Sequence, residues 1–129
     1  MYDRLILDTC ALIWLSIGGG ELSAQALNSI KDAQGVYVSS ISAFEISLKY
    51  KKGGIELPCD PGRWFVDVLD NHDISEIVVD SRVAITSTKL PFLHNDPCDR
   101  FIIATAMLNN FTIVTTDRLF EQYNVNVLQ

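Results

Sequence analysis

Short apolar runs alternate along this chain with longer segments of helical periodicity. The short runs are rich in β-branched residues and predict strands at residues 4–8, 35–40, 75–80, 111–117 and 124–128. The longer segments carry apolar residues at helical spacing and predict helices at residues 22–33, 42–54, 61–72, 80–90 and 97–110. This alternation indicates an α/β fold with a central, mostly parallel sheet in a three-layer α/β/α arrangement, formed by one domain over residues 1–129.

Capping signals mark the starts of two of these helices. Ser42 stands three residues before Glu45, which is the spacing of a capping box, and Gly53 follows near the other end of the same helix. Asp96 precedes Pro97, a pair typical of the N-cap and first position of a helix. We therefore expect one helix to begin after Ser42 and another after Asp96.

The composition is that of a globular protein of the cytoplasm. Apolar residues make up 48% of the chain, enough for a packed core, and no stretch stays apolar over the length that a bilayer requires. The first residues also lack the pattern of a cleavable signal. Cys10, Cys59 and Cys98 are odd in number and far apart, which favours structural thiols in a reducing compartment. We therefore predict a cytoplasmic protein that does not bind a membrane.

The chain is acidic overall but contains one basic segment. Its net charge of −6 would repel a polyanion at long range, which argues against broad electrostatic binding of nucleic acid. Lys49, Lys51 and Lys52 nevertheless form a local basic edge near the end of a predicted helix. These lysines are either a solvated helix face or contacts to the backbone of a nucleic acid.

Four acids are predicted to gather at one edge of the sheet. Asp8 and Asp117 stand at the ends of predicted strands, whereas Glu45 and Asp99 lie in the first turns of helices. The carboxyl ends of parallel strands and the starts of the helices that follow them meet at the same edge. Each acid alone could instead cap a helix or, for Glu45, pair with Lys49 one turn later.

A cation would resolve the repulsion within such a group of acids. Asp8 and Asp99 are flanked by apolar sequence that will be buried, and carboxylates packed together without a counter-ion have raised pKa values. The group offers oxygen ligands without a cysteine or histidine cluster, which suits Mg²⁺ or Mn²⁺ rather than Zn²⁺. The sequence therefore predicts a divalent metal site.

Four segments of the chain stand in series: LILDTCALIW, VSSISAFEISLKYKKGGIELP, LPFLHNDPCDRFIIATA and TIVTTDRLFEQYNVNVL. Together they resemble PIN-domain proteins, and more narrowly the VapC ribonuclease toxins of bacterial toxin–antitoxin pairs. The resemblance implies a PIN-like fold and hydrolysis of RNA phosphodiester bonds with Mg²⁺ or Mn²⁺ as cofactor. It also implies that metal binding and catalysis depend on Asp8, Glu45, Asp99 and Asp117.

The same resemblance implies roles for further residues and for partners. Thr9 and Thr115 stand beside the acids, where their hydroxyls would orient a carboxylate or a metal-bound water. Asp96 would be the helix cap that orients Asp99. RNA backbone contacts are implied for the basic edge, Lys49, Lys51 and Lys52. The family pattern further implies a homodimer that a small VapB-like antitoxin inhibits.

Some residues near the acids have less obvious roles. Cys98 stands where relatives commonly have an aromatic residue, which affects local packing, and for Cys10 a structural thiol is preferred to a metal ligand. His94 has no second histidine near it in the sequence, so we expect it to order its loop through hydrogen bonds rather than to bind metal. Arg100 directly follows Asp99 and is expected to balance its charge.

Two other functions fit part of the pattern. An aspartate after the first strand also begins haloacid-dehalogenase-like phosphatases, where it accepts a phosphoryl group, but these carry a second aspartate where this chain has Cys10. The other alternative is a non-catalytic interaction module in which the acids only cap helices. RNA cleavage by the wild-type and Asp8→Asn proteins, with and without metal, distinguishes these functions.

Overall fold

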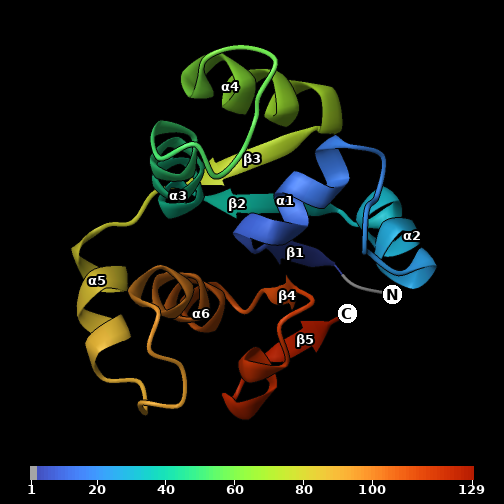
Figure 1. Ribbon diagram of the computed structural model, residues 1–129. Coiled ribbons are helices and arrows are strands. Elements are labelled where there is room, and N and C mark those ends of the chain that lie inside the picture. Colours follow the sequence, from blue (N-terminus) through green and yellow to red (C-terminus); the bar gives the residue numbers. More distant parts are fainter. Residues whose placement is uncertain (1–2) are drawn as a thin grey trace.

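The computed structural model describes residues 3–129 and contains a five-stranded sheet with helices on both faces (Figure 1). The strands are β1 (Arg4–Leu7), β2 (Gly35–Ser39), β3 (Ile74–Ile77), β4 (Thr112–Val114) and β5 (Asn126–Leu128). The helices are α1 (Thr9–Ser16), α2 (Ala24–Asp32), α3 (Ser40–Lys51), α4 (Pro61–His72), α5 (Ser81–Thr88), α6 (Pro97–Asn109) and a 3₁₀ helix, η1 (Arg118–Gln122). Every pairing in the order β3-β2-β1-β4-β5 is parallel, so the predicted three-layer α/β fold is confirmed.

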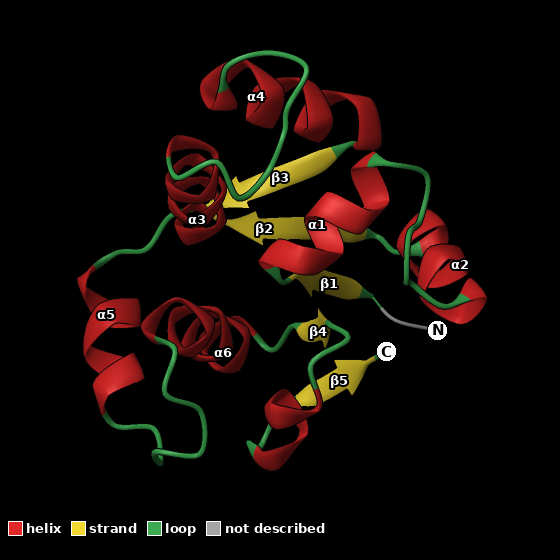
Figure 2. Ribbon diagram, in the orientation of Figure 1, coloured by secondary structure: helices red, strands yellow, loops and turns green. Residues whose placement is uncertain are grey.

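Helices lie on both faces of the sheet (Figure 2), and alternate residues of a strand belong to opposite cores. Leu5 and Leu7 of β1 belong to one core with α1, α2 and α4, whereas Ile6 between them belongs to a second core with α5 and α6. All three side chains are fully buried. Because both faces of the sheet are covered at its centre, β1 carries a continuous apolar run from Leu5 to Leu7 rather than apolar residues alternating with polar ones.

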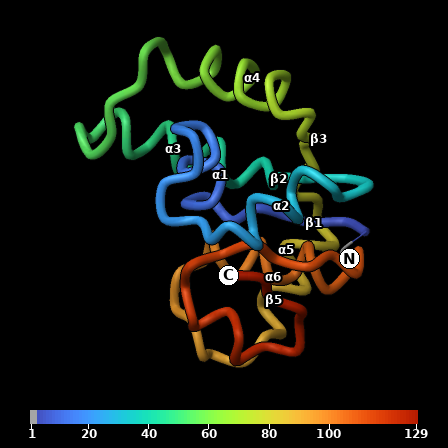
Figure 3. Tube along the Cα trace, turned by 90° about the vertical axis from the view of Figure 1, so that its right-hand side faces the viewer, coloured from blue at the N-terminus to red at the C-terminus, as the bar shows by residue number. Residues whose placement is uncertain are grey.

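The strand order changes direction between β1 and β4. From β1 the chain moves outward to β2 and β3, and then returns across the sheet to β4 and β5 on the other side of β1. A view at right angles shows α4 and β3 at one edge of the molecule and β5 toward the other (Figure 3). At such a switch point the loops after the two central strands diverge, which leaves a crevice at their carboxyl ends.

The longest helix begins where the sequence predicts. α6 has 13 residues, and Asp96 is its N-cap, with Oδ1 accepting the Cys98 N–H at 2.9 Å and Pro97 at the first position. Asn110, in the left-handed conformation, ends the helix. No helix within residues 3–129 combines the length and the apolar composition needed to cross a bilayer.

The start of α3 differs from the prediction. Its N-cap is Ser39, whose hydroxyl accepts the Ile41 N–H at 3.1 Å, so the helix begins at Ser40. Ser42 is buried inside the helix. The predicted capping box of Ser42 and Glu45 is therefore wrong, because Ser39 at the end of β2 offers the same capping chemistry three residues earlier.

Other element boundaries also differ from the prediction. α1 is not among the predicted helices because Ile13 and Trp14, which lie between its buried positions, also pack against the core, so no polar stripe marks a helix. β3 covers residues 74–77 instead of 75–80, since Asp80 caps α5. β4 ends at Val114 instead of residue 117 because its pairing with β5 ends at Leu128.

Candidate metal centre

Five carboxylates line a cleft of about 190 Å³ at the carboxyl edge of the sheet, those of Asp8, Glu45, Asp96, Asp99 and Asp117. Asp8 follows β1, and Asp117 lies between β4 and η1. Glu45 is in the second turn of α3 and Asp99 is in the first turn of α6. The structure therefore brings together the four acids that the sequence singled out, at the crevice between β1 and β4.

Asp8 both caps α1 and contributes to the cleft. Its Oδ1 accepts the Ala11 N–H at 2.8 Å, and its Oδ2 accepts a hydrogen bond from the Thr115 hydroxyl at 2.5 Å. Burial raises the pKa of Asp8 to about 6, while these two hydrogen bonds lower it and the charges of Asp117 and Glu45 raise it. The capping alternative thus accounts for one oxygen of Asp8 but not for the other.

Glu45 is held by a hydroxyl from α1. The Thr9 hydroxyl donates to Glu45 Oε1 at 2.5 Å and lies 2.9 Å from the hydroxyl of Ser42. Burial raises the pKa of Glu45, and the hydrogen bond from Thr9 opposes this effect. The alternative ion pair with Lys49 is not formed among residues 3–129, where the only ion pairs are those of Arg63 with Asp67 and of His94.

His94 joins the other two acids. Its Nε2 lies 2.9 Å from Oδ2 of Asp99 and 3.1 Å from Oδ2 of Asp117. Asp117 also caps η1, because its Oδ1 accepts the Leu119 N–H at 2.9 Å. Burial, followed by the charges of neighbouring acids, raises the pKa of Asp99 to about 8. Near neutral pH Asp99 therefore retains its proton unless a cation replaces it.

Two features of the site are not visible in the sequence pattern. The hydrogen-bonding role expected for His94 is confirmed, but only the structure shows its contact with two of the acids. Arg100 does not balance the charge of Asp99, because its guanidinium is buried and donates to backbone carbonyls at the end of α5 and in the loop before α6. These are the carbonyls of Ser87, Leu90, Pro91 and His94. In the sequence, only their closeness to Asp99 could have drawn attention to His94 and Arg100.

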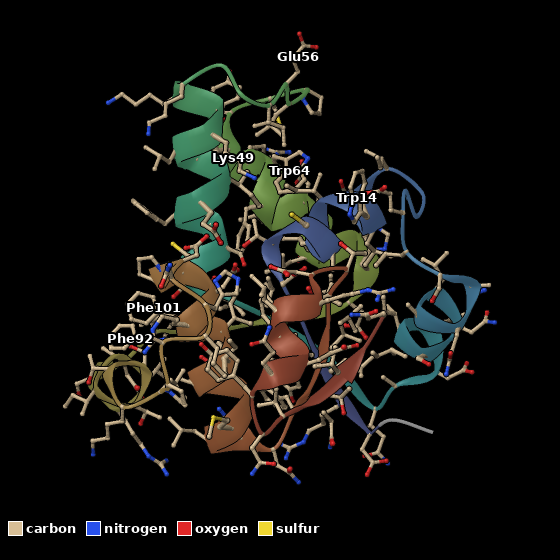
Figure 4. All side chains as sticks on the ribbon, turned by 60° about the horizontal axis from the view of Figure 1, so that its bottom comes forward. Trp14, Lys49, Glu56, Trp64, Phe92 and Phe101 are labelled. Carbon is tan, nitrogen blue, oxygen red and sulfur yellow. The ribbon has the colours of Figure 1, made fainter. Side chains whose placement is uncertain are left out.

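One of the three lysines predicted to contact RNA reaches the cleft. Lys49 lines the cleft and projects from α3 on the side of α1 (Figure 4). Lys51 and Lys52 are exposed at the end of α3 and do not line the cleft. Only Lys49 therefore brings its positive charge beside the acids.

The cysteines are free thiols in different environments. Cys10 is exposed and lines the cleft, so the expectation of a structural thiol at this position is wrong. Cys59 is half-buried and packs against the core. Cys98 is half-buried, and burial raises its pKa to about 12, which disfavours the thiolate that a metal would require.

The donor set fits a hard divalent ion. It consists of carboxylate oxygens from four separate parts of the chain, and hydroxyls of Thr9 and Thr115 hold two of these carboxylates in place. A cation in the cleft would offset burial, the main cause of the raised pKa values of Asp8 and Asp99. Oxygen donors of this kind suit Mg²⁺ or Mn²⁺.

Known proteins resemble this chain in sequence and in fold. A family model described as PIN domain matches residues 5–126. Ribonuclease VapC22 from Mycobacterium tuberculosis (strain ATCC 25618 / H37Rv) is 30% identical over 115 residues, which are 88% of this chain and 87% of that protein.

Two solved structures share the fold at 18% identity. VapBC2 from Rickettsia felis, bound to a DNA fragment from its promoter, matches with a TM-score of 0.70 over 97% of each chain. DNA-bound VapBC from Salmonella typhimurium matches with a TM-score of 0.69 over 98% of this chain and 97% of that one. At this level of identity the likeness concerns the fold.

Proposed function

The chain belongs to the PIN-domain family, in its VapC type, and we propose on this premise that it is a metal-dependent endoribonuclease, the toxin of a toxin–antitoxin pair. The observation that carries the proposal is the convergence of five carboxylates, among them the four proposed ligands, in one cleft at the switch point of the sheet. We also propose that residues 1–129 form one PIN domain. Membership of the PIN family favours hydrolysis of RNA over phosphoryl transfer to Asp8.

The proposed cofactor is Mg²⁺ or Mn²⁺, held by the carboxylates of Asp8, Glu45, Asp99 and Asp117. When bound, such an ion supplies Lewis acidity, because it places positive charge beside the scissile phosphate and activates water. The chain has a net charge of −6 and would repel RNA on its own. Neutralisation of the acidic cleft is therefore a condition for the approach of a phosphate.

The hydroxyls of Thr9 and Thr115 keep two of the acids in position. Each donates to one oxygen of its carboxylate, Glu45 or Asp8, at 2.5 Å, which also fixes the direction of the other oxygen. Both threonines are buried, so water does not compete for their hydroxyls. Carboxylates fixed in this way need little rearrangement when a cation and RNA bind.

The lysines at the end of α3 are proposed to contact the RNA backbone. Lys49 stands beside the acids, and Lys51 and Lys52 extend the positive charge away from the cleft along the same helix. Replacement of Lys49 by Gln should raise the KM for RNA with little change in kcat. An unchanged KM would remove this residue from the proposed path of the RNA.

Cleavage of single-stranded RNA tests the function directly. The wild type should cleave RNA in the presence of Mg²⁺ or Mn²⁺, and EDTA should abolish this cleavage. The Asp8→Asn substitution should slow cleavage by about 100-fold or more. The matched control is Asp80→Asn, because Asp80 caps α5 by accepting the Val83 N–H at 2.9 Å but lies outside the cleft. Equal cleavage by the wild type and Asp8→Asn would refute a metal-dependent nuclease, and labelling of Asp8 by a phosphodonor would instead favour a phosphatase.

We further propose that the chain forms a homodimer and binds a VapB-like antitoxin. The VapBC structures from Rickettsia felis and Salmonella typhimurium, which share the fold of this chain, support a VapB-like partner. Exposed apolar side chains are available for these contacts, among them Phe44 and Leu48 on α3 and Phe92 and Leu93 before α6.

Two measurements test these partners. Light scattering of the isolated chain should detect a dimer, and a species of only 14.4 kDa would refute it. The antitoxin should co-purify with the chain when the adjacent reading frame is expressed together with it, and it should inhibit cleavage of RNA. An adjacent product that neither binds nor inhibits would refute this pairing.

A further inference from the structure

We propose that His94 is a positioning residue that clamps the carboxylates of Asp99 and Asp117 into one half of the metal site. A single nitrogen, Nε2, lies within hydrogen-bonding distance of Oδ2 of both acids. The other two acids each have a hydroxyl for this purpose, on Thr115 and Thr9. The inference rests on the proposed function, because it concerns the ion that these acids would hold.

The hydrogen bonds of the imidazole determine which nitrogen carries the proton. Nδ1 of His94 accepts the backbone N–H of Asp96 at 3.2 Å, so Nδ1 is unprotonated. A neutral imidazole then has its proton on Nε2, which makes Nε2 a donor and leaves it without a lone pair for a metal. The His94 Nε2–H therefore donates to Oδ2 of Asp117, while Oδ2 of Asp99 lies 2.9 Å from the same nitrogen. The three residues are close enough to form a ligand group, but the ring takes part as a donor.

His94 is held through its backbone as well as its ring. The buried ring packs against Phe120 with 5.6 Å between centroids and 88° between planes. The His94 N–H donates to the Tyr123 hydroxyl at 2.8 Å, and the same hydroxyl donates to the carbonyl of Pro91 at 2.8 Å. The His94 carbonyl accepts from Arg100 at 3.3 Å. A ring fixed in this way can set the positions of the acids that it contacts.

The clamp connects two elements that contribute separate ligands. Asp99 belongs to α6, and Asp117 belongs to the segment between β4 and η1. Two partly buried carboxylates without a shared neighbour of this kind would repel each other and turn apart. Asp117 uses its Oδ1 for the Leu119 N–H, whereas Oδ1 of Asp99 has no hydrogen-bond partner within the part of the chain that the structure describes. The clamp therefore leaves an oxygen of Asp99 available for a cation.

Two substitutions separate the clamp from the ordering of the loop. His94→Asn keeps an acceptor near the Nδ1 position for the Asp96 N–H but is too short to reach the carboxylates, whereas His94→Gln carries an N–H about as far as Nε2. Isothermal titration calorimetry measures the binding of Mn²⁺, and thermal unfolding checks that each variant folds. We expect His94→Asn to bind Mn²⁺ about 10- to 100-fold more weakly than the wild type, and His94→Gln to recover most of the affinity.

Two matched controls, Asp99→Asn within the site and Asp80→Asn outside it, make the outcomes distinguishable. Binding of Mn²⁺ by His94→Asn at wild-type affinity, together with weak binding by Asp99→Asn, would refute the clamp and leave the proposed function standing. Equal weakening in His94→Gln and His94→Asn would also refute it, because the donor would not matter. A wild type that neither binds Mn²⁺ nor cleaves RNA would refute the proposed function itself. If His94→Asn does not fold, His94→Phe, which keeps the ring packing on Phe120, replaces it.

Discussion

Removal of the charge of Asp8 should stabilise the metal-free protein although it prevents cleavage of RNA. In Asp8→Asn the side-chain carbonyl can accept the Ala11 N–H that Oδ1 accepts in the wild type, so the cap of α1 persists. The amide N–H can donate to the hydroxyl oxygen of Thr115, so that contact also persists. The substitution therefore removes a buried negative charge and little else.

The magnitude of the effect follows from the pKa of Asp8. Its pKa is 3.8 in the unfolded chain and about 6 in the folded protein, so between these values the folded state binds more protons than the unfolded state. The free energy of unfolding of the wild type therefore falls as the pH rises from about 4 to about 7, and this group has no further effect above that. The difference between the two pKa values corresponds to about 3 kcal/mol. Asparagine does not titrate, so Asp8→Asn does not lose this part of its free energy of unfolding as the pH rises.

Urea unfolding of both proteins in EDTA, at about pH 4 and about pH 8, measures the effect. The stability of Asp8→Asn relative to the wild type should increase by about 3 kcal/mol between the two pH values. Addition of Mg²⁺ at the higher pH should favour the wild type, since a bound ion stabilises it by about 2.7 kcal/mol at about 100 times its Kd. A stability difference that does not change with pH would refute the reasoning, because it would mean that folding does not desolvate the Asp8 carboxylate.

Two further predictions concern the supports of the site, and a third concerns the turn after α1. Thr115→Val removes the hydroxyl that donates to Asp8, and urea unfolding at neutral pH should show a loss of about 2 kcal/mol; full retention of stability would contradict a role for this hydrogen bond. In Arg100→Lys the single ammonium group cannot reach all the carbonyls to which the guanidinium donates, so thermal unfolding should show a loss of about 3 kcal/mol. An unfolding temperature equal to that of the wild type would mean that these hydrogen bonds are dispensable. In Gly20→Ala, at a φ of +49°, the new Cβ would overlap the indole of Trp14, so a loss of about 1–3 kcal/mol is expected in the same assay, and unchanged stability would contradict this close approach.

Elements with a strong local cause can be predicted from the sequence. α4 covers Pro61–His72 as predicted, because Asp60 caps it and proline suits its first position. The start of α3 could not be predicted, because several serines there have the same capping ability. Strand β2 decides among them, since it holds the backbone extended as far as Ser39.

The sequence by itself determined that acids stand at the ends of strands and in the first turns of helices, and the alternation of elements placed these positions at one edge of a parallel sheet. Only the tertiary structure decided which side chains meet there. Thr115 donates to Asp8 across 107 residues of sequence, and His94 contacts both Asp99 and Asp117. Periodicity specifies which face of an element is buried, whereas a hydrogen bond requires two side chains from different elements to lie within about 3 Å, and the packing of α1, α3 and α6 at the end of the sheet sets that distance.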